Sequence, residues 1–243
     1  MGMTGVVDVH THTIPGIDDG ARTIEESCEL LLQAYSQGIT AVIATPHYSR
    51  RHSSREGVER LRSLADEVRQ AIHRIEPDIQ LYLGQELFYH ESLVEALKEG
   101  RALTLSDSAY VLVEFEPSVA YEGLYRGIRA LFSAGYKPIV AHIERYRCLR
   151  QEECLAELTG SGCLLQMNYE SLQGSGFHPG VRWCRRQVLN GRIHLLGTDM
   201  HRTDFRPPDI TEAMNWLTHH VEEELIEDMT RNCALRFLHR KDR

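Results

Sequence analysis

Several features that would define other classes of protein are missing from this chain of 243 residues. No apolar run approaches the roughly 18 residues that are needed to cross a bilayer. The N-terminal residues lack the basic segment and the apolar core of a signal peptide. Linkers rich in glycine, serine or proline, low-complexity tracts and repeats of fixed period are also absent. We therefore expect a single domain over residues 1–243, located in the cytoplasm and without membrane insertion.

The cysteine content and the charge exclude further classes. The six cysteines are scattered and form no C-x-x-C pair, which is typical of reduced cysteines that pack in an interior. No G-x-G-x-x-G follows an apolar run, so nothing supports a nucleotide cofactor. The formal net charge of -8 argues against general affinity for nucleic acid or for an anionic membrane. We expect neither a redox role nor a nucleic-acid partner, and the sequence leaves the oligomeric state open.

Short apolar runs alternate with amphipathic segments along the whole chain. The apolar runs predict strands at 6–9, 39–45, 79–83, 110–113, 138–141, 163–167 and 194–197. The segments between them have apolar residues at helical spacing. They predict helices at 23–37, 55–75, 91–99, 122–134, 152–159, 181–190 and 211–238, the last one long enough for an interruption.

A strand followed by a helix, repeated about seven times, predicts a parallel sheet with right-handed crossovers. The chain length is close to the roughly 250 residues that are typical of a (β/α) barrel. We therefore predict an α/β fold, a distorted (β/α)7 TIM-like barrel. An open doubly wound sheet is the alternative.

Residues that bind metal follow six of the seven predicted strands. His10 and His12 are spaced i, i+2 at the first strand end, and Asp199 and His201 repeat that spacing at the last. In a parallel barrel the C-terminal ends of all strands meet at one mouth, so distant residues would converge there. The seventh strand ends at Asn168, a weak ligand. The candidate ligands are His10, His12, His47, Glu86, Glu114, His142, Asp199 and His201, with one of Asp18 and Asp19.

Each candidate alone has a structural alternative. Either Asp18 or Asp19 could bind an ion or simply shape a turn, and Glu114 is preferred to Glu116 only because it lies nearer to its strand. Together, nine side chains are too many for one ion. Histidines and carboxylates without a thiolate suit two or three divalent ions, such as Mn, Fe, Zn or Mg. Such ions, about 3.5–4 Å apart, can activate a bridging water and hold a phosphoryl group in line.

Five blocks of this sequence resemble bacterial PHP-domain (polymerase and histidinol phosphatase) proteins. The blocks lie at 8–20, 45–47, 112–115, 141–146 and 197–201, with Arg206-Pro207-Pro208 behind them. They cover nearly the whole chain in the order of the family. The most specific are His142-Ile143-Glu144-Arg145-Tyr146 and Asp199-Met200-His201. Within the superfamily, the blocks are most similar to the manganese-dependent protein tyrosine phosphatases of capsule and exopolysaccharide operons.

The resemblance implies a PHP fold with a site for three metal ions. Two ions would be held by His10, His12, Glu86, Glu114, His142 and Asp199, and the third by Asp19, His47 and His201. Arg145 and Arg206 would bind the phosphate and stabilise the transition state, although arginines often pair with structural carboxylates instead. The expected metal is Mn, with Fe, Mg or Zn as alternatives. The expected partner is a phosphotyrosine protein, and the resemblance suggests the tail of a bacterial tyrosine kinase.

Other functions are compatible with parts of this pattern. A phosphatase of the same superfamily could act on histidinol phosphate, and a metal-dependent amidohydrolase also opens with H-x-H. That class often bridges its metals with a strand-end lysine, whereas Lys137 lies at the start of its strand. A non-catalytic zinc protein would usually bind through cysteines. Cysteine-dependent tyrosine phosphatase chemistry is excluded, because no cysteine stands six positions before an arginine.

The basic segment Arg50 to Arg55 matches no block of the family. It is interpreted either as the solvated start of a helix or as a charge that steers an anionic phosphopeptide.

Overall fold

The computed structural model describes residues 5–48 and 53–238, and every structural statement below concerns these residues. The strands are β1 (Val6–Thr11), β2 (Ile39–Ala44), β3 (Gln80–Leu83), β4 (Glu86–Phe88), β5 (Tyr110–Glu114), β6 (Lys137–Val140), β7 (Leu164–Asn168) and β8 (Leu195–Gly197). The helices are α1 (Ile24–Ser36), α2 (Arg55–Ile75), α3 (Leu93–Lys98), α4 (Tyr121–Ser133), α5 (Glu152–Gly160), α6 (Pro179–Leu189), α7 (Thr211–His220), α8 (Glu223–Glu227) and α9 (Cys233–Leu235).

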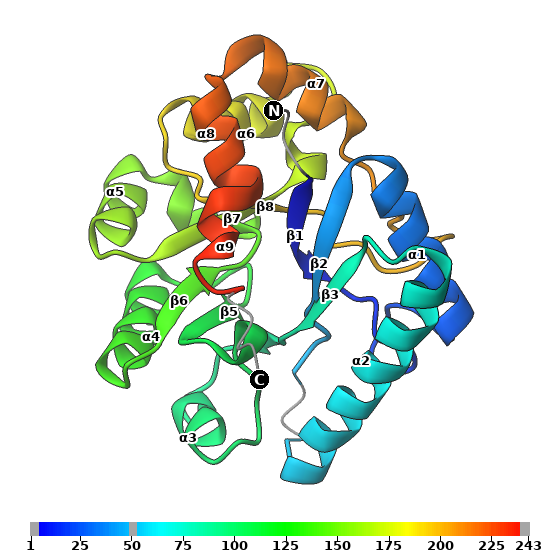
Figure 1. The fold of residues 1–243 in the computed structure, drawn as a ribbon. Coiled ribbons are helices and arrows are strands. Elements are labelled where there is room, and N and C mark those ends of the chain that lie inside the picture. The colour runs from blue at the N-terminus through cyan, green and yellow to red at the C-terminus, as the bar shows by residue number, and fades with distance from the viewer. Residues whose placement is uncertain (1–4, 49–52, 239–243) are drawn as a thin grey trace.

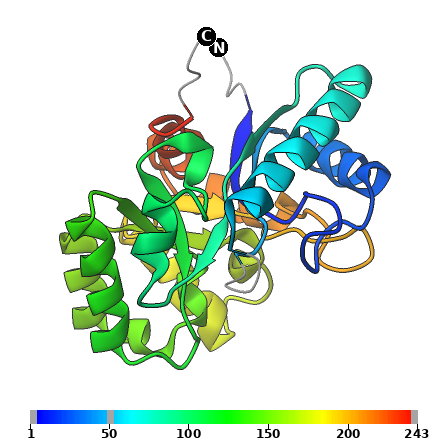
Figure 2. The same ribbon diagram turned by 90° about the horizontal axis from the view of Figure 1, so that it is seen from below.

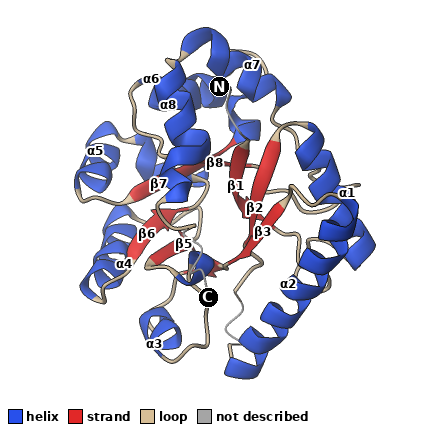
Figure 3. Cartoon of the chain, in the orientation of Figure 1, coloured by secondary structure: helices blue, strands red, loops and turns tan. Residues whose placement is uncertain are grey.

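The strands form two parallel sheets whose edges meet. One sheet has the order β1-β2-β3 and the other the order β4-β5-β6-β7-β8. Isolated parallel bridges join them, from Thr11 to Met200 on one side and from His47 to Glu86 on the other. Figure 3 shows the strands gathered in the middle with helices around them. The architecture is the predicted distorted (β/α)7 TIM-like barrel.

The third strand position is divided, which the sequence did not indicate. β3 pairs with β2, whereas β4 pairs with β5, and Gly84 and Gln85 separate the two short strands. A Cβ atom on Gly84 would lie 2.6 Å from the Leu105 side chain and 3.1 Å from its Cα. Only glycine permits this close approach, so the break occurs where the chain must pass Leu105. All seven predicted strands are present, and β4 is an additional one.

Amphipathic helices surround the strands as predicted. α1 and α2 lie on the side of β1, β2 and β3, and α4 and α5 lie on the opposite side (Figure 1). Thr23 and Ser54 cap the first two helices, and their side chains accept hydrogen bonds from the N–H groups of Glu26 and Gly57. The predicted long final helix is interrupted at Val221–Glu222, where α7 ends and α8 begins.

The C-terminal segment packs against the barrel interior. Cys233, Ala234 and Phe237 belong to one apolar cluster with interior side chains such as Val7 and Leu195. In Figure 1, α9 lies in front of the strands, and Figure 2 shows the same segment from below, close to the start of β1. The last described residues therefore contribute directly to the core.

None of the described helices is long and apolar enough to cross a membrane.

We expect Phe237→Ala to lower the free energy of unfolding by about 3 kcal/mol, because the ring is almost fully buried and its removal leaves a cavity. Urea unfolding of the purified protein measures this change. Phe177→Ala is the matched control, since that ring is 91% exposed, and it should leave the unfolding midpoint within error of the wild type. Equal effects of the two substitutions would contradict the packing described for the C-terminal segment.

Candidate metal centre

The structure brings together all nine side chains proposed as ligands from the sequence and the family resemblance. They form four overlapping groups, and within each group the possible ligand atoms lie within 4.8 Å of one another. The groups are His12, Asp19, His47 and His201; His10, Glu86 and His142; His10, His12 and Asp199; and His47, Glu86 and Glu114. The predicted convergence of distant strand ends is therefore confirmed as geometry.

The buried group of His10, His12 and Asp199 lies against Glu86. His10 Nε2 lies 3.1 Å from Glu86 Oε2 and 3.6 Å from Asp199 Oδ1. His12 Nε2 lies 3.4 Å from Glu86 Oε2 and 3.3 Å from Asp199 Oδ1. Ligands about 2.1 Å from a metal are about 3.0–3.4 Å apart in octahedral or tetrahedral geometry. His10, His12 and Asp199 therefore have the spacing of ligands around one divalent ion, and Glu86 lies beside them.

A second group continues from the same carboxylate. Glu86 Oε1 lies 2.7 Å from His142 Nε2, and Glu86 Oε2 lies 3.0 Å from His47 Nδ1. Glu114 approaches both imidazoles, at 3.5 Å from His142 and 3.6 Å from His47. Because its two oxygens face different imidazoles, Glu86 could contribute to more than one of these groups if metal ions were bound.

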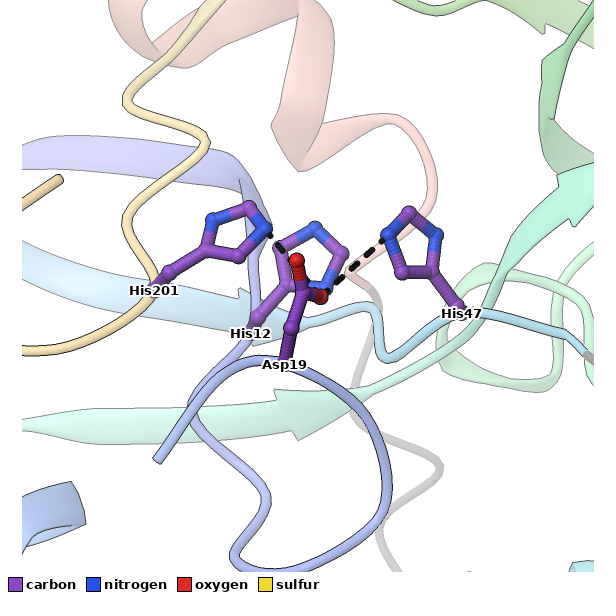
Figure 4. A group of neighbouring side chains, drawn as sticks. All are labelled: His12, Asp19, His47 and His201. Carbon is purple, nitrogen blue, oxygen red and sulfur yellow. Dashed lines mark ion pairs between the residues drawn. The ribbon is translucent and has the colours of Figure 1, made fainter. Parts of the chain in front are cut away.

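The third group is open to solvent. Asp19 lies between two imidazoles, with Oδ1 3.6 Å from His47 Nε2 and 3.5 Å from His201 Nε2 (Figure 4). Asp19 and His47 have side chains that are 59% and 39% exposed, whereas His201 is buried. The two nitrogens of His47 face different groups, so this residue can serve either one. An ion at the rim would keep positions open for water or substrate.

Unsatisfied buried atoms support a cation in the mouth. His10 Nε2, His12 Nε2 and Glu86 Oε2 are buried, and none makes a hydrogen bond of acceptable geometry to a described residue. Buried polar atoms without partners are costly and rare in native proteins. A divalent ion would satisfy all three atoms at once, so the side chains present fit the metal that the sequence pattern implies.

Three further residues orient the ligands, and the sequence did not single them out for this role. Asp18 Oδ2 lies 2.8 Å from His12 Nδ1 and accepts a hydrogen bond from the backbone N–H of His47. Gln166 Oε1 accepts from the backbone N–H of His142 and lies 3.2 Å from His10 Nδ1. Such partners fix the orientation of a ligating imidazole.

Asn168, expected to be a weak ligand, also belongs to this supporting layer. Its Nδ2 donates to Asp199 Oδ2 over 3.0 Å, and its Oδ1 accepts from Gln166. Gly197 leaves the room that this packing needs, since a Cβ there would lie 2.9 Å from the His10 Cβ. No residue type or spacing distinguishes Gln166 or Asn168 in the sequence, because their role depends on the neighbouring strand.

Arg145 and Arg206 reach the mouth from two different loops. Arg145 Nη2 lies 2.5 Å and Arg206 Nη1 3.1 Å from Asp199 Oδ2. Both side chains are about one-third exposed, at 37% and 35%. Each guanidinium has further N–H donors besides the one that contacts Asp199. The two arginines thus pair with a carboxylate and still face the solvent-filled side of the mouth.

The charges of the mouth compensate one another. Burial raises the pKa of Glu86, but the neighbouring His10, His12 and His142 outweigh it and hold that pKa well below its usual range. Burial lowers the pKa of His142, but the carboxylates of Glu114 and Glu86 raise it to about 9. The pKa of His12 is shifted upward as well, against the effect of its burial. In the metal-free protein, protons on His12 and His142 balance the buried carboxylates.

Two other predictions from the sequence concern the cysteines and the basic segment Arg50 to Arg55. The cysteines are unpaired, and none is a member of a described group. Arg50 and Arg51 of the basic segment lie outside the described residues. Arg55 begins α2 and donates from Nε to the carbonyl oxygen of Glu99, as the structural interpretation of that segment expects.

We expect the metal-free protein to lose stability as the pH rises from about 6.5 to 8.5. An imidazole whose pKa is about 9 when folded and about 6.5 when unfolded stabilises the fold fully below pH 6.5, and this contribution is lost as the pH approaches 9. Melting temperatures in excess chelator at pH 6.5, 7.5 and 8.5 measure the slope. His142→Gln should flatten it, and a melting temperature that rises over this interval would contradict the assignment.

Comparisons with known proteins agree with this geometry. The family model for capsular polysaccharide synthesis, CpsB/CapC, matches residues 6–239. The tyrosine-protein phosphatase YwqE from Bacillus subtilis (strain 168) is 30% identical over 237 residues, covering 95% of this chain and 91% of that relative. The tyrosine-protein phosphatase CpsB from Streptococcus pneumoniae is 29% identical over 214 residues, covering 86% of this chain and 88% of that relative.

A solved structure is similar over the same extent. It belongs to crystallographic work on YwqE from Bacillus subtilis and CpsB from Streptococcus pneumoniae, described there as unique metal-dependent tyrosine phosphatases. The sequence identity is 28%, the TM-score is 0.85, and the match covers 95% of this chain and 94% of the other. The resemblance to tyrosine phosphatases of capsule operons is confirmed. Since the family model spans almost the entire sequence, the chain belongs to the CpsB/CapC family of capsular polysaccharide synthesis.

Proposed function

We propose that this protein is a metal-dependent phosphomonoester hydrolase that removes phosphate from phosphotyrosine in a protein, as a single domain over residues 1–243. The observation that carries the proposal is the convergence of nine His, Asp and Glu side chains on one mouth, with two guanidiniums at its rim. The relatives named tyrosine-protein phosphatase support the substrate class.

Three ions are expected when the site is loaded, with Mn as the preferred metal. Two would be held by His10, His12, Glu86, Glu114, His142 and Asp199. The third would be held by Asp19, His47 and His201, at the exposed rim. Bound divalent ions supply Lewis acidity and a hydroxide nucleophile at neutral pH. Asp18 and Gln166 keep the imidazoles of His12 and His10 in the orientation that binding requires.

Arg145 and Arg206 would bind the phosphoryl oxygens. Their remaining N–H donors face the open side of the mouth, and their contact with Asp199 fixes both guanidiniums near the ligands. Donors held in place in this way stabilise negative charge that grows on the phosphoryl oxygens in the transition state. A tyrosine leaving group has a pKa of about 10, so it leaves without a strong general acid.

The physiological substrate is proposed to be a phosphotyrosine protein of capsule or exopolysaccharide regulation, with the tail of a bacterial tyrosine kinase as the expected case. The description of the family, capsular polysaccharide synthesis, supports this assignment. The substrate would approach the third group of ligands first, because Asp19 and His47 are the most exposed members of the site.

We expect chelation to abolish hydrolysis of a phosphotyrosine peptide and Mn to restore it, since the ligand set contains only side chains that bind divalent ions. His142→Ala should lower kcat by about a hundredfold or more, because it removes a buried ligand that faces Glu86 and Glu114. Phosphate release after add-back of single metals measures both effects.

His73→Ala is the matched control for this experiment, because His73 is exposed on α2, and it should retain wild-type turnover. Histidinol phosphate and an amide substrate are assayed in parallel. Faster turnover of histidinol phosphate would assign the chain to small-molecule phosphatases instead. Full activity of His142→Ala would refute the ligand assignment.

We expect Arg145→Lys and Arg206→Lys each to lower kcat/KM for a phosphotyrosine peptide by about ten- to a hundredfold. Lysine keeps the positive charge but loses the fork of donors that can bind a phosphate and Asp199 together. Steady-state kinetics with bound Mn content measured in each variant separate lost phosphate binding from lost metal. Arg147→Lys, an exposed neighbour, should behave as wild type. Unchanged kinetics in both variants would show that Arg145 and Arg206 have only a structural role.

A further inference from the structure

A cavity of about 570 Å³ adjoins the candidate metal centre. Its walls come from the loop residues Gly16 and Ile17, from His47 and Tyr48 after β2, and from the first turns of α2. His47 therefore belongs both to the metal-binding groups and to this cavity. In Figure 1, α2 lies beside β3. Gln85 follows β3 and lines the cavity, and Glu86 directly after it belongs to the metal-binding groups. A substrate bound at the ions can extend directly into this space.

Part of the cavity wall is apolar and rigid. Leu61 and Val58 of α2 are buried, and Tyr48 is buried with its hydroxyl 2.8 Å from Ser53 Oγ. Ser53 in turn accepts a hydrogen bond from Arg101 Nη1 over 3.1 Å. These contacts connect Tyr48, Ser53 and Arg101 at the cavity wall.

Gln85 points to the chemistry of the ligand. The residue is only 5% exposed, and its Oε1 accepts a hydrogen bond from the backbone N–H of Leu103 over 2.9 Å. The oxygen is thereby assigned, and the amide nitrogen, which makes no hydrogen bond to a described residue, remains as a donor at the cavity wall. A donor that is accessible at the cavity wall can pair with a ligand group that accepts hydrogen bonds.

The charged groups of the cavity favour an anion. Arg60 is exposed and forms no ion pair with the described residues. Arg101 contributes a second guanidinium, whose Nε forms an ion pair with Glu99 over 2.6 Å and whose Nη1 donates to Ser53 Oγ. Glu56 is the acidic residue of the wall, and it lies in the first turn of α2, where the helix dipole stabilises its charge. Arg60 is therefore the wall cation without an ion pair to a described residue, and the remaining N–H groups of Arg101 and the Gln85 amide add hydrogen-bond donors.

We propose that this cavity binds an anionic side chain that lies close to the phosphotyrosine in the substrate polypeptide. The inference rests on the proposed function, and it adds a preference for acidic or doubly phosphorylated segments over neutral ones. The overall charge of the protein is negative, so it would repel such segments unless a local basic surface attracted them. Arg60, Arg101 and Gln85 form that surface next to the metal centre.

The first part of the test measures equilibrium binding, which does not require turnover. Peptides carry phosphonomethyl-phenylalanine, which cannot be hydrolysed, and one glutamate placed at each position up to four residues on either side. The alanine peptide is the reference. At one or more positions, glutamate should tighten binding to the Mn-loaded protein by about three- to tenfold, as measured by fluorescence polarisation. Affinities equal within twofold at every position would overturn the proposal.

Charge reversal identifies the residue responsible. Arg60→Glu should remove or invert the preference for glutamate. Arg74→Glu is the matched control, since it makes the same charge change on an exposed residue of α2, about 21 Å further along the helix, and it should keep the preference. Equal loss in both variants would show a general electrostatic effect of net charge and would overturn the assignment to this cavity.

Phosphoserine in place of the preferred glutamate separates the two sources of the anionic group. A larger gain with phosphoserine assigns the cavity to a second phosphate, and a larger gain with glutamate assigns it to a carboxylate. The matching phosphotyrosine peptides are then assayed for hydrolysis. Hydrolysis without any preference for an anionic neighbour refutes the cavity assignment and leaves the proposed function standing. Selective binding without hydrolysis refutes the proposed function and leaves the cavity assignment standing.

Discussion

Glu86 is the side chain on which the rest of the site depends. It is almost completely buried, and its two oxygens lie 2.7–3.4 Å from the nearest nitrogens of His10, His12, His47 and His142. An ionised carboxylate in such a place is costly unless positive charge surrounds it. Protons on His12, His47 and His142, whose pKa values are raised, supply that charge in the metal-free protein, and divalent ions can replace them. Divalent ions that bind in the mouth should displace these protons, so metal binding there should release protons.

The break in the third strand positions this carboxylate and also places Gln85 in the wall of the neighbouring cavity. Gln85 and Glu86 are consecutive, and adjacent residues of an extended chain point in opposite directions. One of them faces the cavity beside α2, and the other faces the ligands. Gly84 makes the break possible by passing close to Leu105. A single local irregularity thus places a proposed substrate-binding residue and a proposed metal ligand side by side.

The sequence predicted the barrel and the strand-end ligands because both depend on simple periodic features. An imidazole or carboxylate directly after an apolar run must reach the mouth of a parallel barrel. β4 was missed because a strand of three residues is too short for any period to show. Asp18 and Asp19 are adjacent and chemically identical, so only the folded loop distinguishes the residue that orients His12 from the one that faces His47. Gln166 acts across a strand pairing that local sequence does not encode.

Asp199 links the ligands to the arginines through its two oxygens. Oδ1 faces His10 and His12, and Oδ2 accepts from Asn168 and lies close to Arg145 and Arg206. His142, Asp199 and Arg206 all have left-handed backbone conformations, with φ of 32°, 55° and 58°. Such conformations cost on the order of 1 kcal/mol or more for residues with a side chain, and they persist only where surrounding contacts impose them. The same contacts hold this backbone and the two guanidiniums, so the proposed phosphate-binding groups and the proposed metal ligands have a fixed relative position.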